Sequence, residues 1–225
     1  MAREHEELIV GLFDRELLKF GDFLWTTKSG RSTPIYYNQR PITSINFGPG
    51  AMRPLAQRVV LNLAVNAYVK EAKTSEADHI YGIPQSSTHL MGMVALRAEM
   101  SSLWGRVTEN DYGEHNKIEG FYSAGQSVLQ FDDVVTDAGS KLDSASGLAL
   151  AGLQTEGFVV MFDRQEGGTQ TVEDAGYSIR SVFSLSEAVA VLEQNKRLGS
   201  QEIGWVVKYH EDLQASGVLS TFTLG

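Results

Sequence analysis

The apolar residues of the chain first recur at helical spacing. Over residues 6–20 they return every three or four positions, which predicts an amphipathic helix that Gly21 ends. The same spacing predicts a second helix over residues 54–70. Residues 22–45 lie between these helices and are rich in turn-forming residues, so we expect an extended, hairpin-like hood there.

After residue 70 the apolar positions form short runs that alternate with helical stretches. Strands are predicted at 79–81, 102–104, 128–131, 158–162 and 179–183. Helices are predicted at 88–100, 140–156 and 185–196, and a packing helix with a frayed tail at 200–225. Because strands separated by helices pair through parallel crossovers, we expect an α/β fold with a parallel sheet flanked by helices.

The length favours one domain. The 225 residues exceed the roughly 150 residues of an average domain by too little to make two. Within a single domain of residues 1–225, we expect the helix and hood at 1–45, the α/β core at 46–199 and a C-terminal extension at 200–225.

The composition removes several classes of function. The absence of cysteine excludes disulfide scaffolds, zinc–thiolate sites and thiol catalysis. A formal net charge of −9 without a basic block argues against a nucleic-acid surface but allows a small phosphate pocket. We expect a soluble cytoplasmic protein without membrane contact, because the charged N-terminus is unlike a secretion signal and no long apolar run is present. The histidines lack metal-ligand spacing, and we assign no metal ligands.

Residues 128–141 carry the clearest indication of a ligand site. An apolar strand leads into Asp132 and Asp133, a loop of small and hydroxyl-bearing residues follows, and a helix is expected to begin near Ser140. Ligands of open α/β sheets bind beyond the carboxyl ends of the strands, and the N–H groups of a helix N-terminus suit a phosphate. The carboxylates suit ribose hydroxyls or a Mg²⁺ ion that bridges them. Solvated aspartates at a strand end, followed by a serine-capped helix, would explain the same residues without a ligand.

Four segments of the chain resemble orotate phosphoribosyltransferases, a branch of the type I phosphoribosyltransferases. Residues 132–140 resemble the loop that binds phosphoribosyl diphosphate (PRPP), and residues 27–40 resemble the N-terminal Lys-Ser-Gly segment of the family. Residues 162–168 are similar to its Asp-Arg turn, and residues 106–120 match the frame of its mobile catalytic loop. The segments follow the order of the family and span residues 6–197.

The resemblance implies a homodimeric, Mg²⁺-dependent enzyme. It would join orotate to the ribose 5-phosphate of PRPP, giving orotidine 5′-monophosphate and diphosphate in pyrimidine biosynthesis. The implied ligands of the 5′-phosphate are Thr136, Asp137, Ala138, Gly139 and Ser140. Asp132 and Asp133 would address the ribose.

The resemblance also implies a site for the base. Arg164 would pair with the orotate carboxylate, because a planar guanidinium binds a carboxylate through two hydrogen bonds. Lys28 would approach the base or the diphosphate, and Tyr36 and Tyr37 would form an aromatic wall. Each residue also has an ordinary explanation. Lys28 would be an exposed turn lysine, one of the two tyrosines would face the core, and Arg164 would form a salt bridge with Asp163 or Glu166 at a turn.

The catalytic loop departs from the pattern of the family. Two positions at which the family has lysines hold Val107 and Asn110, and residues 107–119 contain four acidic residues against one lysine. We therefore expect impaired turnover, because losing one preorganised charge typically lowers a rate by about 10²–10³. Arg106 remains a catalytic candidate, and His115 is a candidate that would substitute in part for the missing charge.

A second departure follows the strand at 79–81. Ser86 and Ser87 can donate hydrogen bonds near a helix start, but they lack the positive charge that the family often places there. Ala138 replaces a loop glycine, which is a mild change unless the position requires a positive φ. Two alternatives stay open: a non-catalytic relative that binds PRPP or a nucleotide as a sensor or partner subunit, and a phosphoribosyltransferase for another base.

Overall fold

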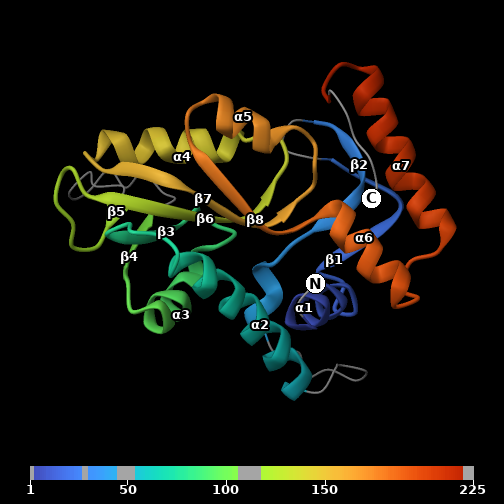
Figure 1. Ribbon diagram of the computed structural model, residues 1–225, viewed down its shortest axis with the longest axis horizontal. Coiled ribbons are helices and arrows are strands. Elements are labelled where there is room, and N and C mark those ends of the chain that lie inside the picture. The colour runs from blue at the N-terminus through green and yellow to red at the C-terminus, as the bar shows by residue number, and fades with distance from the viewer. Residues whose placement is uncertain (1–2, 27–29, 45–53, 106–117, 220–225) are drawn as a thin grey trace.

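A six-stranded sheet forms the centre of the computed structural model, which describes residues 3–26, 30–44, 54–105 and 118–219 (Figure 1). Its strands lie in the order β5-β4-β3-β6-β7-β8, and every neighbouring pair is parallel except β4 and β5. The strands are β3 (His79–Gly82), β4 (Ser101–Gly105), β5 (Ile118–Glu119), β6 (Ser127–Val135), β7 (Gln154–Asp163) and β8 (Ser178–Ser184). The predicted α/β fold is confirmed.

Helices cover both faces of this sheet. They are α2 (Pro54–Ala72), α3 (Thr88–Ala98), α4 (Gly139–Leu150), α5 (Gly168–Asp174) and α6 (Leu185–Gln194). Figure 1 shows α4 and α5 above the sheet and α2 and α3 below it. Successive side chains of a strand point to opposite faces, so the sheet contributes to two separate apolar clusters. The central strand β6 is buried from Val128 to Asp133, as is typical of a parallel strand covered on both sides.

The predicted hood is a hairpin with helices packed around it. β1 (Leu18–Thr26) pairs antiparallel with β2 (Ser32–Tyr37), and the short 3-10 helix η1 (Arg40–Thr43) follows. The N-terminal helix α1 (Arg3–Phe13) packs against α2 and α6. The C-terminal helix α7 (Ser200–Ala215) lies against both strands of the hairpin (Figure 1). This last contact brings the end of the described chain to the hood.

Two predicted helices end at least six residues earlier than expected, because the chain turns at a residue with a left-handed φ. The helix predicted at 6–20 ends at Phe13, and Glu16, with a φ of 58°, directs the chain into β1. The helix predicted at 140–156 ends at Leu150, and Gly152, with a φ of 80°, directs the chain into β7. Beyond the first turn Leu18 and Phe20 are buried in β1, and beyond the second Leu153 is buried immediately before β7, so their spacing alone was misleading.

Three short elements were not predicted: η1, β5 and α5. Each is too short to show a hydrophobic period. The expected frayed tail beyond residue 219 and most of the expected catalytic loop lie outside the described residues. None of the helices in the described part of the chain combines the length and apolar character that a membrane span requires.

Candidate active site

A pocket of about 270 Å³ lies between the β1–β2 hairpin and the carboxyl ends of β3, β6 and β7. β6 continues through both aspartates to Val135, whereas the strand was predicted to end at Phe131. Strand alternation sends Asp132 towards α4 and Asp133 towards the hairpin and α2. Both side chains border the pocket, yet they are only 4% and 8% exposed, so the interpretation as solvated aspartates is wrong.

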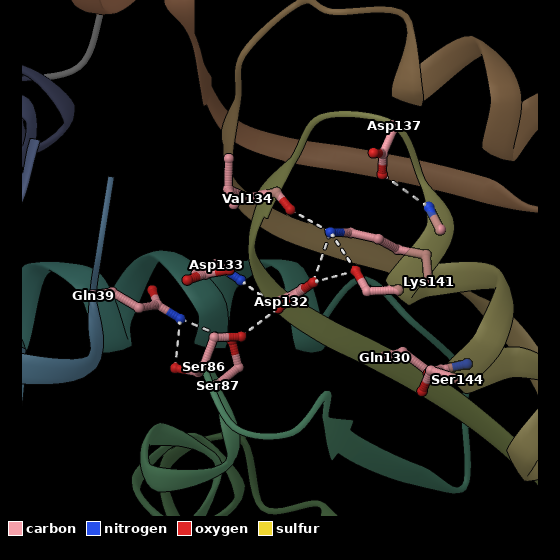
Figure 2. Close-up of polar contacts among 12 residues, drawn as sticks. Gln39, Ser86, Ser87, Gln130, Asp132, Asp133, Val134, Asp137, Lys141 and Ser144 are labelled. Atoms are coloured by element: carbon pink, nitrogen blue, oxygen red, sulfur yellow. Dashed lines mark hydrogen bonds and ion pairs between the residues drawn. The ribbon is translucent and has the colours of Figure 1, made fainter. Parts of the chain in front are cut away.

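Asp132 is held by four contacts, and Figure 2 shows Lys141 and Ser86 converging on its carboxylate. Its Oδ2 atom lies 2.6 Å from Lys141 Nζ and 3.4 Å from Ser140 Oγ. Its Oδ1 atom accepts hydrogen bonds from Ser86 Oγ at 2.5 Å and from the Asp133 amide at 2.9 Å. Burial opposes ionisation, but the Lys141 charge and these hydrogen bonds outweigh it and lower the pKa of Asp132. Asp132 is therefore a buried anion.

Asp133 has a different environment. No side chain in the described segments forms an ion pair with its carboxyl group. Burial and the adjacent charge of Asp132 raise the pKa of Asp133 to about 7, against the opposing charges of Lys141 and Arg40. Its carboxyl group therefore keeps its proton to a higher pH than an ordinary aspartate does.

A buried hydrogen-bond network joins the pocket floor to the hood. Gln39 Nε2 donates to Ser87 Oγ at 2.8 Å and to the Ser86 carbonyl oxygen at 3.3 Å. Tyr68 Oη donates to the Asp132 carbonyl oxygen at 2.6 Å. Ser86 borders the pocket, but Ser87 is fully buried and does not border it. The two predicted serines therefore serve, in this state, to fix the end of β6 and the start of α3.

The loop after β6 contains one strained residue. Ala138 has a φ of 69°, a left-handed conformation that favours glycine, so its replacement of a loop glycine is not mild. Asp137 Oδ1 accepts a hydrogen bond from the Gly139 amide at 3.3 Å. The Gly139 amide, one of those that would face a phosphate, is thus already hydrogen-bonded to an acidic side chain. Thr136, Asp137 and Ser140 border the pocket, whereas Ala138 and Gly139 do not.

Arg164 follows β7, borders the same pocket and contacts the hairpin through Thr33. Its Nη2 atom lies 2.5 Å from Glu166 Oε1 and 2.6 Å from Thr33 Oγ1. The acidic neighbour considered as an alternative partner is thus in contact with it. Glu166 Oε1 is paired through this contact, whereas Arg164 Nε and Glu166 Oε2 are buried without a hydrogen-bond partner. The guanidinium therefore has hydrogen-bonding capacity that its protein partners do not use.

The C-terminal helix α7 supports the turn that carries Arg164. His210 is fully buried, and its Nε2 atom lies 3.1 Å from the Arg164 carbonyl oxygen while its Nδ1 atom lies 3.0 Å from that of Val206. Burial and the negative charge of Glu166 raise the pKa of the neighbouring Tyr209. No motif in the sequence indicated that the last helix would contact this turn.

The two predicted tyrosines face different environments. Tyr36 stacks on Trp25 with ring centroids 4.2 Å apart, and both residues border the pocket. Tyr37 packs edge-to-face against Phe162 and Phe183 in the core, although it also borders the pocket. Strand alternation explains the difference, because adjacent residues of β2 point to opposite faces. The aromatic wall that a planar ligand would meet is therefore Tyr36 with Trp25.

The fold brings most of the predicted site residues to one pocket. Those that border it are Tyr36, Tyr37, Ser86, Asp132, Asp133, Thr136, Asp137, Ser140 and Arg164. Lys28, Arg106 and His115 lie outside the described residues. Lys141, which also borders the pocket, was missed, although a lysine in the first turn of a helix opposes the helix dipole and could have been noticed. Within the described ranges, no three His, Asp or Glu side chains form a cluster that could hold a metal ion.

A parallel sheet whose carboxyl edge carries this loop and pocket, covered by a hairpin hood, is the architecture of a type I phosphoribosyltransferase. No family model matches the chain. The chain is 30% identical over 199 residues to the orotate phosphoribosyltransferase of Chlamydia caviae, covering 85% of this chain and 89% of that protein. The chain therefore belongs to the orotate phosphoribosyltransferase family.

Longer proteins also match. The chain is 30% identical over 207 residues to the uridine 5′-monophosphate synthase of Bos taurus, covering 91% of this chain but only 40% of the bovine protein. Among solved structures, the UMP synthase of Leishmania donovani matches with a TM-score of 0.77 and 24% identity, covering 91% of this chain and 41% of that one. The chain thus spans about two fifths of these two relatives.

Proposed function

We propose that the protein is an orotate phosphoribosyltransferase, which joins orotate to the ribose 5-phosphate of PRPP and releases diphosphate in pyrimidine biosynthesis. The observation that supports this most directly is that one pocket is lined both by residues of the loop after β6 and by Arg164, whose buried Nε has no hydrogen-bond partner. The loop would bind a sugar phosphate and the arginine would bind the carboxylate of a base.

At the sugar end, we assign the 5′-phosphate to the loop of residues 136–140. The loop leads directly into α4, so backbone amides at a helix N-terminus and the Thr136 hydroxyl are available to the phosphate, whereas the Ser140 hydroxyl would have to exchange its 3.4 Å contact with Asp132 for it. The Asp133 carboxyl group lies beside this loop and accepts hydrogen bonds from ribose hydroxyls. Its ionised form would also stabilise positive charge that develops on the ribose as the bond to diphosphate breaks.

At the base end, Arg164 binds the orotate carboxylate and Tyr36 packs on the plane of the ring. A guanidinium has five N–H donors, of which the protein engages Nη2 with Thr33 and Glu166. The stacked pair Tyr36 and Trp25 supplies a flat apolar surface at the same end. Holding both substrates in one orientation is the main catalytic contribution of such a site, because orientation alone can lower a barrier by about 7–11 kcal/mol.

Mg²⁺ is part of this proposal as a component of the substrate. The diphosphate oxygens of PRPP are ligands that Mg²⁺ prefers, and the ion would neutralise part of the charge on the leaving diphosphate. The homodimer, the single-domain organisation, the cytoplasmic location and the impaired turnover expected from Val107 and Asn110 stay predictions.

The test follows the absorbance of orotate in the presence of PRPP and Mg²⁺. We expect consumption of orotate that is lost in Asp133→Asn and kept in Asp174→Asn, a control that removes an exposed carboxylate of α5. No consumption by the wild type, together with thermal stabilisation by PRPP, would instead support a binding protein that acts as a sensor or partner subunit.

A further inference from the structure

Lys141 is an unusual residue for the floor of this pocket. It lies in the first turn of α4, is 2% exposed and places its ammonium among oxygen atoms of the protein. Nζ lies 2.6 Å from Asp132 Oδ2 and 3.4 Å from Ser140 Oγ, and it also donates to the Val134 carbonyl oxygen (Figure 2). An ammonium has three N–H donors, so these partners use all of them.

The carboxylate of Asp132 is saturated in the same way. Its four contacts, from Lys141, Ser140, Ser86 and the Asp133 amide, match the roughly four lone-pair directions of a carboxylate. A ribose hydroxyl could bind Asp132 only by displacing one of these partners. Asp133 is adjacent in sequence and borders the same pocket, but among the described side chains its carboxyl group forms no ion pair, and the side-chain hydrogen bond that affects its pKa is with Asp132 itself.

We propose that Lys141 is a positioning residue that holds Asp132 as a fixed internal anion and thereby leaves Asp133 as the one carboxyl group of the pair that binds the ribose of PRPP. The proposal rests on the proposed function for the identity of the ligand. The division of labour itself follows from the contacts of the two aspartates.

The charge of Lys141 also sets when Asp133 ionises. The groups that face Asp133 are Asp132 on β6, Lys141 on α4, Arg40 on η1, and the buried hydroxyls of Tyr37 on β2 and Tyr68 on α2. Asp132 is the nearest negative charge and Lys141 is the cation that compensates it. If Lys141 were neutral, two adjacent buried carboxylates would repel each other, and Asp133 would ionise only at higher pH.

Three variants test this inference: Lys141→Met, Asp132→Asn, and the double variant Lys141→Met/Asp132→Asn. Each is measured by thermal unfolding, by the pH dependence of kcat/KM for PRPP, and by ¹³C NMR titration of the Asp133 carboxyl carbon. The control is Lys208→Met/Asp212→Asn, which makes the same changes in an exposed pair of α7 whose closest N–O distance is 3.2 Å.

Lys141→Met should unfold at lower temperature, lose about 10²-fold in kcat/KM at neutral pH and shift the Asp133 titration upwards by about one unit. The double variant leaves neither charge unpaired. It should recover the unfolding temperature, return to within about tenfold of the wild-type kcat/KM, and titrate Asp133 below the wild-type value. Asp132→Asn alone should lower the Asp133 titration further, because Lys141 stays charged.

Two results would overturn the inference. If the Asp133 titration were unchanged in Lys141→Met, the charge of Lys141 would not influence Asp133, and the lysine would only fill space. A double variant as inactive as Lys141→Met, although folded, would show that Asp132 itself binds the substrate. If the wild type consumes no orotate, the proposed function fails, whereas the NMR titrations and the recovery of stability still test the role of Lys141.

Discussion

Two buried ion pairs contribute side chains to the pocket, and they differ in how completely their hydrogen bonds are satisfied. At the sugar end, Lys141 and Asp132 use their donors and acceptors on each other, on Ser86 and on backbone groups. At the base end, Arg164 and Glu166 make one contact of 2.5 Å, and buried polar atoms of both side chains stay without hydrogen bonds.

This difference indicates that one ion pair holds its neighbours in place and that the other can bind a ligand. A saturated pair gains nothing from a ligand and holds neighbouring groups in place. A buried polar atom without a partner destabilises the free protein by about 1–3 kcal/mol, and a ligand that pairs with it recovers that free energy. We therefore regard the Lys141–Asp132 pair as part of the scaffold and the Arg164–Glu166 pair as part of the ligand site.

The substitution that would break this comparison most clearly is Arg164→Lys. It keeps the positive charge beside Glu166 but removes the planar fork, so we expect kcat/KM for orotate to fall about 10²-fold while KM for PRPP changes by less than about twofold. Steady-state kinetics with each substrate varied in turn would measure this. Arg180→Lys, in a partly exposed pair with Glu71, is the control and should change neither value. Equal losses for both substrates would contradict a role confined to the base end.

Asp133→Asn tests the raised pKa of Asp133 through the free energy of unfolding. The pKa of Asp133 is raised in the folded state to about 7, so the folded protein favours the protonated form and loses stability as pH rises from the unfolded-state pKa towards 7. Asparagine stays neutral. The variant should therefore exceed the wild type in free energy of unfolding by about 2–4 kcal/mol at about pH 8, and by much less at about pH 4.

Urea unfolding of Asp133→Asn and the wild type at both pH values would measure this difference. If the difference in free energy of unfolding did not depend on pH, the pKa of Asp133 would be that of an ordinary aspartate. The two aspartates would then not differ in ionisation. The same variant should lose activity, since stability and ribose binding make opposite demands on this carboxyl group.

Glu166→Gln sharpens the comparison at the base end. It removes the negative charge that competes with a substrate carboxylate for Arg164, so KM for orotate should fall about threefold. The unfolding temperature should fall by a few degrees, because the buried guanidinium loses its counter-ion. Glu173→Gln, on the exposed face of α5, is the matched control. A higher KM would show that Glu166 mainly orients Arg164.

The smallest expected effect is that of Asp137→Asn. The Asp137 carboxylate accepts the Gly139 amide and adds negative charge beside the loop of residues 136–140. Its neutralisation should lower KM for PRPP about threefold at low ionic strength, and added salt should reduce the difference because the side chain is exposed. Asp174→Asn should show no such change. An equal effect at all salt concentrations would assign Asp137 a structural role in the loop.

The sequence predicted the scaffold well because its signals are local. The apolar runs located the strands β3, β4, β6, β7 and β8, and their alternation with helical stretches predicted the parallel sheet. The errors fell where a turn interrupts an apolar pattern. Glu16 and Gly152 adopt left-handed conformations that redirect the chain, and the hydrophobic spacing across them is accidental.

The site was predicted in composition but not in arrangement. Asp132 and Asp133 look equivalent in a sequence, and both border the pocket. Strand alternation, however, places Lys141 beside Asp132 and leaves Asp133 without a cationic partner among the described side chains. Glu166 was considered as a partner of Arg164, but the contribution of His210 depends on α7 folding back onto a turn 46 positions earlier. Contacts of that kind have no local signature.

The order of apolar and polar residues by itself determined the α/β architecture, the edge of the sheet at which the candidate site lies, and the residue types available there. These properties depend on periods of two and of about 3.6 residues, which the chain carries whether or not it is folded. Only the tertiary structure decided that Asp132 is paired with a lysine and Asp133 with no cation among the described side chains, and that Arg164 Nε lacks a hydrogen-bond partner. Those distinctions depend on burial and on distances between segments far apart in the chain, and both exist only once the sheet, the hood and the last helix have packed together.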